Sequence, residues 1–292
     1  MCEKDDLEAF ARLDQGVTRR RFGLMTLGAG FAAALPGLAR GVETKGQDVD
    51  IPTSAGTADA HFVHPASGRH PGVLIWPDIM GLRPAFKSMA TRLAESGYAV
   101  LVVNPFYRLK PAPTSTPPVD LNNPETRKAL LGMKDTLTPE TTQVDAKAFV
   151  AFLDQQGPVD TGRRIGTAGY CMGGALVMRT AAAVPDRVGA GATFHGGGLA
   201  TDAPDSPHRL IPGMKAQFLI AIAANDDEKE PAAKDMLRTA FAQAKLPAEI
   251  EVYAGTKHGW CPPDSHVYDA DQAEKAWGRM LALFGRALAS GE

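Results

Sequence analysis

From about residue 58 onward, short apolar runs alternate with longer stretches in which apolar residues recur every three or four positions. The short runs indicate strands buried on both faces, and the longer stretches indicate helices with one buried face. Predicted strands cover residues 58–63, 72–76, 98–103, 164–168, 191–194, 218–223 and 249–253. Predicted helices cover residues 84–96, 141–155, 175–184, 231–244 and 270–288. Alternating strands and helices predict an α/β fold, with a mostly parallel central sheet flanked by helices on both faces.

A Pro- and Thr-rich stretch over residues 105–139 interrupts this alternation. Long connections in compact domains often cover an active site, and a plain surface excursion fits the same composition equally well. Neither an internal repeat nor a second domain boundary is visible in the pattern. Residues 40–292 are therefore interpreted as one domain.

The first 39 residues differ in character from the rest of the chain. Residues 18–24, Thr-Arg-Arg-Arg-Phe-Gly-Leu, resemble the twin-arginine export motif S/T-R-R-x-F-x-L. An apolar stretch too short to span a membrane follows, and Pro-Gly-Leu-Ala then ends at Ala39 in a small-x-small pattern that suits signal peptidase. We expect residues 1–39 to be a signal peptide read by the twin-arginine machinery. The mature protein would then be periplasmic or secreted and would not contact a membrane; an uncleaved anchor or a disordered basic arm is the alternative.

Charge narrows the set of partners further. The 292-residue chain has a formal net charge of -2, and basic runs are absent beyond the first forty residues. Nucleic-acid binders usually display a basic patch, so we expect no nucleic-acid partner.

Residues 169–174, Gly-Tyr-Cys-Met-Gly-Gly, lie between a predicted strand and a predicted helix. The pattern G-x-C-x-G in that context is the nucleophile elbow of α/β-hydrolases, with cysteine in place of serine. Glycines permit the sharp turn, and the N-terminus of the following helix favours a thiolate. The pattern therefore predicts that Cys171 is the nucleophile of an acyl-transfer reaction.

A thiol nucleophile needs a base, and the base needs an acid that orients it. In α/β-hydrolases the chain order is nucleophile, acid, histidine. Asp226 and Asp227 follow the predicted strand 218–223, and His258 follows the predicted strand 249–253. Carboxyl ends of parallel strands meet at one edge of the sheet, so these groups are expected to lie near Cys171.

Together these segments resemble the dienelactone hydrolase family from about residue 49 to the C-terminus. The matching segments are residues 73–82 (Val-Leu-Ile-Trp-Pro-Asp-Ile-Met-Gly-Leu), 93–98, 104–108, 169–174 and 253–260. The resemblance implies an α/β-hydrolase fold with Cys171 as nucleophile and His258 as base. It implies Asp226 as the acid, with Asp227 as the alternative. An ester or lactone would be cleaved through a thioester, without a cofactor.

The same resemblance assigns further positions around the nucleophile. The oxyanion hole would use the main-chain amides of Ile79 and Met172. Asp78 replaces a family glutamate that holds the resting thiol, and it is expected either to bond the thiol or to leave it paired with His258. Arg108 keeps a family arginine that could bind a substrate carboxylate; an ordinary surface arginine is the alternative.

Three more residues are candidates for the pocket or its surroundings. His195 follows the predicted strand 191–194, where it either lines the pocket or belongs to a structural turn, and Trp260 is expected to pack against the pocket. Cys261, three residues after His258, is interpreted as a partly buried bystander or a redox partner of Cys171. No arrangement of residues indicates a metal site: His61 and His64 would point to opposite faces of a strand.

The predicted function is hydrolysis of a small-molecule ester or lactone, of the dienelactone or another activated type. One alternative is an exported redox or binding protein that uses Cys171 and Cys261 without hydrolysis. Another is a peptidase or acyltransferase on the same fold.

Overall fold

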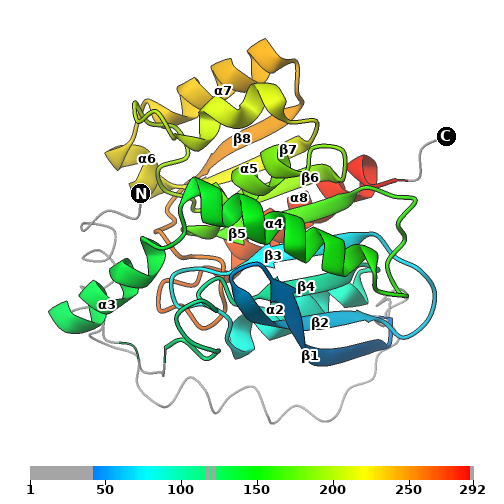
Figure 1. Cartoon of the computed structure of the whole chain (residues 1–292). Helices are drawn as coiled ribbons and strands as arrows, with labels where there is room; N and C mark the ends of the chain where they lie inside the picture. Colours follow the sequence, from blue (N-terminus) through cyan, green and yellow to red (C-terminus); the bar gives the residue numbers. More distant parts are fainter. Residues whose placement is uncertain (1–41, 116–118, 120–122, 290–292) are drawn as a thin grey trace, which may run out of the picture.

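A computed structural model describes residues 42–115, 119 and 123–289, so the predicted signal peptide lies outside the described residues. At the centre is one eight-stranded sheet in the order β1-β2-β4-β3-β5-β6-β7-β8 (Figure 1). The strands are β1 (Thr44–Thr53), β2 (Gly56–Pro65), β3 (Gly72–Trp76), β4 (Ala99–Val103), β5 (Ile165–Tyr170), β6 (Val188–Phe194), β7 (Gln217–Ala223) and β8 (Ala248–Tyr253).

Strands β3 to β8 all run parallel, whereas β2 pairs antiparallel with both β1 and β4. Every residue of β3, β4, β5 and β6 is buried. Strands covered on both faces read as unbroken apolar runs, which is why the sequence pattern located them. The predicted mostly parallel sheet is confirmed.

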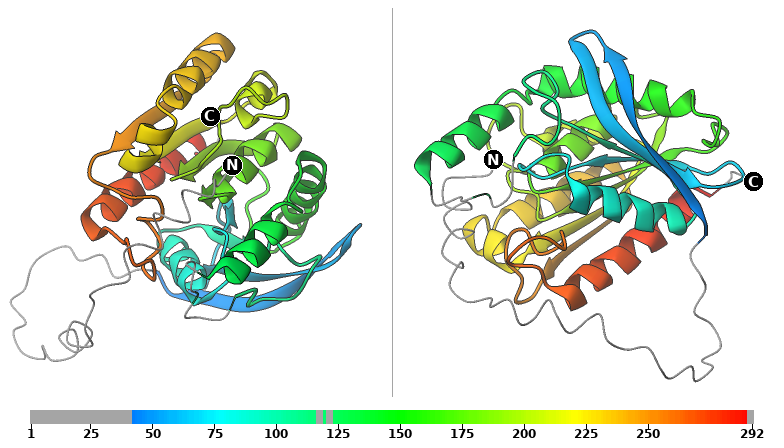
Figure 2. Two further views of the ribbon diagram at one scale, coloured as in Figure 1. Left: turned by 90° about the vertical axis from the view of Figure 1, so that its left-hand side faces the viewer. Right: turned by 90° about the horizontal axis from the view of Figure 1, so that it is seen from below.

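Helices cover both faces of the sheet. They are α2 (Pro84–Glu95), α3 (Pro124–Lys134), α4 (Pro139–Asp154), α5 (Gly173–Ala183), α6 (Ala224–Lys229), α7 (Ala233–Ala244) and α8 (Ala270–Ala287), with a 3-10 helix, η2, at Pro207–Gly213. Helices α4, α5 and α7 pack on one face, and α2 and α8 pack on the other (Figure 2). In the part of the chain that the structure describes, no helix is both long and apolar enough to cross a membrane.

The core consists of two layers separated by the sheet. Successive side chains of β3 alternate between them: Leu74 and Trp76 join the layer under α4 and α5, while Val73 and Ile75 join the layer under α2 and α8. This alternation follows from the two-residue repeat of a strand. Each face of one short strand therefore anchors a different group of helices.

The structure contains elements that the sequence pattern did not predict. Strand β1 is mostly exposed and has no apolar run, because it pairs with β2 through main-chain bonds at the edge of the sheet. Helix α3 lies within the Pro-rich stretch; Pro124 occupies its first turn, and the Asn123 side chain accepts bonds from the amides of Glu125 and Thr126. The stretch is therefore partly helical rather than one long loop.

Candidate active site

The turn at Cys171 has the geometry of a nucleophile elbow. Strand β5 ends at Tyr170, Cys171 has a φ of 55°, and α5 begins at Gly173. A Cβ on Gly169 would lie 2.2 Å from the carbonyl oxygen of Gly173, and one on Gly173 would lie 2.4 Å from that of Trp76. Only glycine fits at both positions, so the two glycines and the left-handed Cys171 define the turn together.

His258 is held by two contacts from the segment that follows β7. Its Nδ1 lies 2.8 Å from Oδ2 of Asp226, and both side chains are buried. Its main-chain N–H donates to Oδ1 of Asn225 at 2.7 Å. Asp227 faces elsewhere and forms an ion pair with Lys234 at 2.7 Å. The structure thus brings Asp226, and not Asp227, to the imidazole; the contact from Asn225 was not anticipated.

His195 connects the elbow to the surroundings of His258. Its Nδ1 accepts the main-chain N–H of Cys171 at 3.1 Å, and the N–H of Cys171 also reaches the carbonyl oxygen of Phe194 at 3.0 Å. The imidazole centroids of His195 and His258 are 5.1 Å apart. Complete burial, together with the facing His258, holds the pKa of His195 well below its usual value. A neutral imidazole is consistent with Nδ1 acting as the acceptor.

Trp260 forms the back of this histidine pair. It is fully buried, its ring lies 5.2 Å from that of His195, and it stacks on Tyr253 at 5.3 Å. Trp260 therefore packs against the imidazole of His195 from the core layer under α2 and α8.

Ile79 and Met172 lie at the ends of neighbouring strands. Strand β3 pairs with β5, with Trp76 opposite Gly169, so the turn after β3 lies next to the elbow. The turn is closed by a bond from the Gly81 amide to the carbonyl oxygen of Asp78 at 2.9 Å. Both Ile79 and Met172 are buried. This register places the two amides proposed for the oxyanion hole on adjacent segments.

Asp78 has a partner that sequence reasoning missed. Its two oxygens accept bonds from Nη1 and Nη2 of Arg83 at 2.6 and 2.9 Å, and Oδ1 also accepts the amide of Met80 at 2.9 Å. Asp78 is therefore one half of a buried ion pair. That Asp78 bonds the thiol, or instead leaves the thiol paired with His258, stays a prediction.

Arg108 also has a partner that sequence reasoning missed. Its Nη1 and Nη2 donate to the two oxygens of Asp145 at 2.6 and 2.7 Å, and its guanidinium lies over the ring of Tyr107. Asp145 is 1% exposed, so the pair is anchored in helix α4. Both Nη groups of Arg108 therefore face a carboxylate of the protein, and its binding of a substrate carboxylate stays a prediction.

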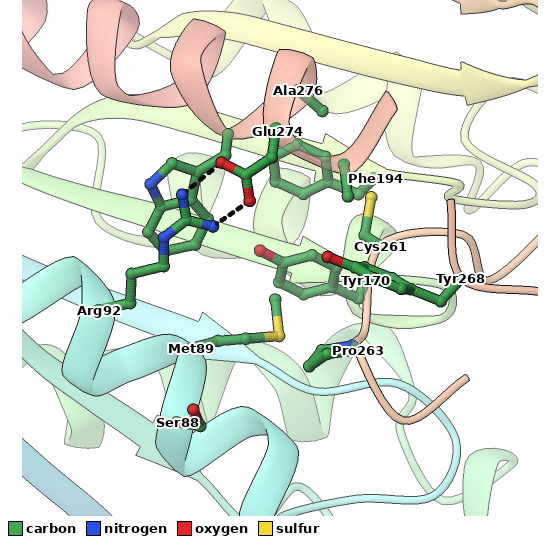
Figure 3. A pocket seen from close by; sticks show the side chains of 12 residues that line it. Ser88, Met89, Arg92, Tyr170, Phe194, Cys261, Pro263, Tyr268, Glu274 and Ala276 are labelled. Atoms are coloured by element: carbon green, nitrogen blue, oxygen red, sulfur yellow. Dashed lines mark hydrogen bonds and ion pairs between the residues drawn. The ribbon is translucent and has the colours of Figure 1, made fainter. Parts of the chain in front are cut away.

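Cys261 lines a cavity on the α2 and α8 side of the sheet. Figure 3 shows Met89, Tyr170 and Cys261 around this space of about 190 Å³, beside the Arg92–Glu274 ion pair. Burial holds the pKa of the Cys261 thiol well above its usual value. Among the described residues no disulfide joins Cys171 and Cys261.

A second hollow lies on the opposite face of the sheet, along α5. It measures about 310 Å³ and extends from Met172 and Gly197 to Arg179. Burial lowers the pKa of Arg179, whose Nη1 donates to the carbonyl oxygen of Leu137 at 3.0 Å. Within the described ranges, no group of three or more His, Cys, Asp or Glu side chains could hold a metal ion.

The family model of the dienelactone hydrolases matches residues 58–288. The chain belongs to the dienelactone hydrolase family. The matched residues cover strands β3 to β8 and β2 from residue 58 onward, together with the elbow, Asp226 and His258. It supports hydrolysis of an ester or lactone as the general activity.

Relatives of this family member include a probable lactonase and a carboxymethylenebutenolidase. The "Probable 2-oxo-3-(5-oxofuran-2-ylidene)propanoate lactonase" of a Bradyrhizobium species is 27% identical, covering 80% of this chain and 91% of its own. The carboxymethylenebutenolidase of Rhodococcus opacus is 27% identical over 81% of this chain and 90% of its own. The solved dienelactone hydrolase-like promiscuous phosphotriesterase P91, from metagenomic libraries, has a TM-score of 0.69 at 23% identity. It covers 84% of this chain and 99% of its own, and this likeness shows the shared fold.

Proposed function

We propose that this protein hydrolyses an activated carboxylic ester or a lactone through a triad of Cys171, His258 and Asp226. The observation that supports this most directly is the 2.8 Å contact between Asp226 Oδ2 and His258 Nδ1. It occurs in the chain order expected of an α/β-hydrolase, downstream of a cysteine in an elbow turn.

The reaction would proceed in two half-reactions. His258, oriented by Asp226, takes the proton of Cys171, and the thiolate attacks the carbonyl carbon. The amides of Ile79 and Met172 stabilise the oxyanion. His258 then protonates the leaving alkoxide or enolate, and a water activated by His258 hydrolyses the thioester. Apart from the substrate and this water, each step uses only side chains and main-chain amides of this chain.

The substrate class follows from the nucleophile and from the relatives. A thiolate expels good leaving groups readily, so enol-lactones and activated esters suit it better than amides. The names of the Bradyrhizobium and Rhodococcus relatives, a lactonase and a carboxymethylenebutenolidase, agree with this choice. We therefore propose a small lactone or ester, with a dienelactone as the first compound to assay.

The test is hydrolysis of p-nitrophenyl acetate and of a dienelactone by wild type, Cys171→Ala and His258→Ala. We expect turnover by the wild type and losses of about 1,000-fold or more in both variants. Acid quenching should leave one acetyl group on the wild-type peptide that contains Cys171. Equal rates for wild type and variants under reducing conditions, with no acetylated peptide, would contradict the proposal.

We also propose that the chain is exported by the twin-arginine route and acts in the periplasm or outside the cell. The support is the sequence of residues 18–24 and the small-x-small ending at Ala39. Replacing Arg19 and Arg20 by lysine should retain the precursor in the cytoplasm of a bacterial host. Export of that variant at the wild-type level would contradict the proposed route.

A further inference from the structure

One guanidinium bridges the loops on the two sides of the candidate site. Arg83, the residue just before α2, is 4% exposed. Its Nη1 and Nη2 donate to Asp78 at 2.6 and 2.9 Å, and its Nε and Nη2 donate to Asp264 at 2.7 and 3.0 Å. Arg83 and Asp264 are 181 positions apart in the chain. Two carboxylates therefore share one planar donor group, which is a geometrically specific arrangement.

Each carboxylate belongs to a segment that the proposed reaction needs. Asp78 directly precedes Ile79, and its Oδ1 also accepts the amide of Met80, so its side chain binds the main chain just beyond Ile79. Asp264 lies six residues after His258, in the segment that joins β8 to α8. Arg83 therefore ties the turn that presents the Ile79 amide to the segment that presents His258.

The electrostatics keep this bridge charged. Burial alone lowers the pKa of Arg83, but the facing carboxylates of Asp78 and Asp264 outweigh it, and the net shift is upward. The guanidinium also lies over the ring of Phe86, 4.8 Å from its centroid. Removing either carboxylate from a buried charge that has two such partners would therefore disturb the local arrangement.

We propose that Arg83 is a positioning residue of the hydrolase site, which holds the Ile79 amide in a fixed place relative to His258 by binding Asp78 and Asp264 together. The inference rests on the proposed function. An oxyanion donor acts on charge that develops in the transition state, so its misplacement lowers kcat more than it raises KM. A displacement of about 1 Å is enough for a loss of about 100-fold.

The test removes only the contact between Arg83 and Asp264. The Asp264 side chain is 41% exposed, so Asp264→Ala leaves the buried Arg83–Asp78 pair intact and strands no buried carboxylate. Glu274→Ala is a matched control. Glu274 forms a similar two-bond pair with Arg92, an arginine within α2, and also comes from the C-terminal part of the chain.

In the full mature chain, Asp264→Ala should lower kcat for p-nitrophenyl acetate by about 10- to 100-fold and change KM by less than about twofold. Amide hydrogen exchange should become faster in residues 77–82 and 257–268. Asp264→Asn, which keeps one acceptor oxygen, should recover part of the loss. Glu274→Ala should show neither the kcat loss nor the faster exchange in residues 77–82.

Several outcomes would overturn the proposal. They are a wild-type kcat in Asp264→Ala, an equal kcat loss in Glu274→Ala, or unchanged exchange in residues 77–82. A wild type without turnover would overturn the proposed function instead. In that case the hydrogen exchange of residues 77–82 in Asp264→Ala alone would decide whether Arg83 ties the two loops together.

Discussion

Asp226 and Asp227 show how adjacent residues of the same type acquire different roles. Asp226 is buried against His258, whereas Asp227 pairs with Lys234 in the first turn of α7. We expect Asp226→Asn to lower kcat about 1,000-fold or more, because an amide does not stabilise the imidazolium as a carboxylate does. Asp227→Asn should change kcat by less than about twofold, because it removes only a partly exposed ion pair.

Both variants are measured with p-nitrophenyl acetate, and their melting temperatures show whether either has unfolded. A kcat loss confined to Asp227→Asn would reverse the assignment of the acid.

His195 should make the stability of the protein depend on pH. Its pKa is lowered in the folded state by burial and by the facing His258, so the unfolded state binds this proton more readily. The contribution of neutral His195 to the free energy of unfolding is therefore fully present above the unfolded-state pKa of about 6.5. It is lost as the pH falls below that value. Wild type should lose more stability between pH 7 and pH 5 than a variant without this group.

His195→Asn is the suitable variant. Asparagine tolerates the positive φ of 42° and offers an oxygen to the Cys171 amide, but it does not titrate. Urea unfolding at the two pH values measures the difference, and other titrating groups are common to both proteins. An identical pH dependence in wild type and His195→Asn would contradict this role.

At the scale of elements, glycines of two helices should respond oppositely to alanine. A Cβ on Gly173 would meet the main chain of Trp76 at 2.4 Å, so Gly173→Ala should disrupt the elbow and abolish activity. A Cβ on Gly278, exposed in α8, would meet no atom within 4 Å. Gly278→Ala should stabilise the protein by about 0.5–1 kcal/mol, because alanine is the better helix former.

Urea denaturation and the rate with p-nitrophenyl acetate test this pair together. A Gly173→Ala variant with wild-type activity, or a destabilised Gly278→Ala, would contradict the close contact at Gly173 or the open space at Gly278.

Elements with a recognisable apolar pattern were predictable from the sequence, including the edge strand β8, whereas the mostly exposed edge strand β1 was not. All seven strands and five helices predicted from apolar patterns are present, because burial dictates their composition. Strand β1 was missed because main-chain pairing with β2 leaves its side chains exposed. In the site, the order of Cys171, Asp226 and His258 follows a rule of chain topology. The Arg83 bridge follows no local rule, since Asp264 meets it only in the folded chain.

At the scale of the whole molecule, Asp145 joins three distant segments. It receives both Nη groups of Arg108 and the hydroxyl of Tyr107, and that hydroxyl lies 2.9 Å from Oγ1 of Thr53 at the end of β1. Arg108→Met should cost about 3 kcal/mol or more of unfolding free energy, because it leaves a buried carboxylate short of its counter-ion. KM should change by the same factor for neutral and for carboxylate-bearing esters.

Arg238→Met provides the control, since Arg238 and its partner Asp235 are exposed and their pair should contribute less than about 1 kcal/mol. If Arg108→Met raised KM only for the carboxylate-bearing ester, Arg108 would instead be a substrate-binding residue.

The order of strands in the sheet also determines when a newly made chain can bring its proposed catalytic residues together. From β5 onward each strand pairs with the next one in the chain, so the sheet grows along a single edge as synthesis proceeds. Cys171 follows β5, Asp226 follows β7, and His258 follows β8. A nascent polypeptide therefore presents its thiol long before the base that would activate it. Under the proposed mechanism the nucleophile stays idle until the last strand has docked.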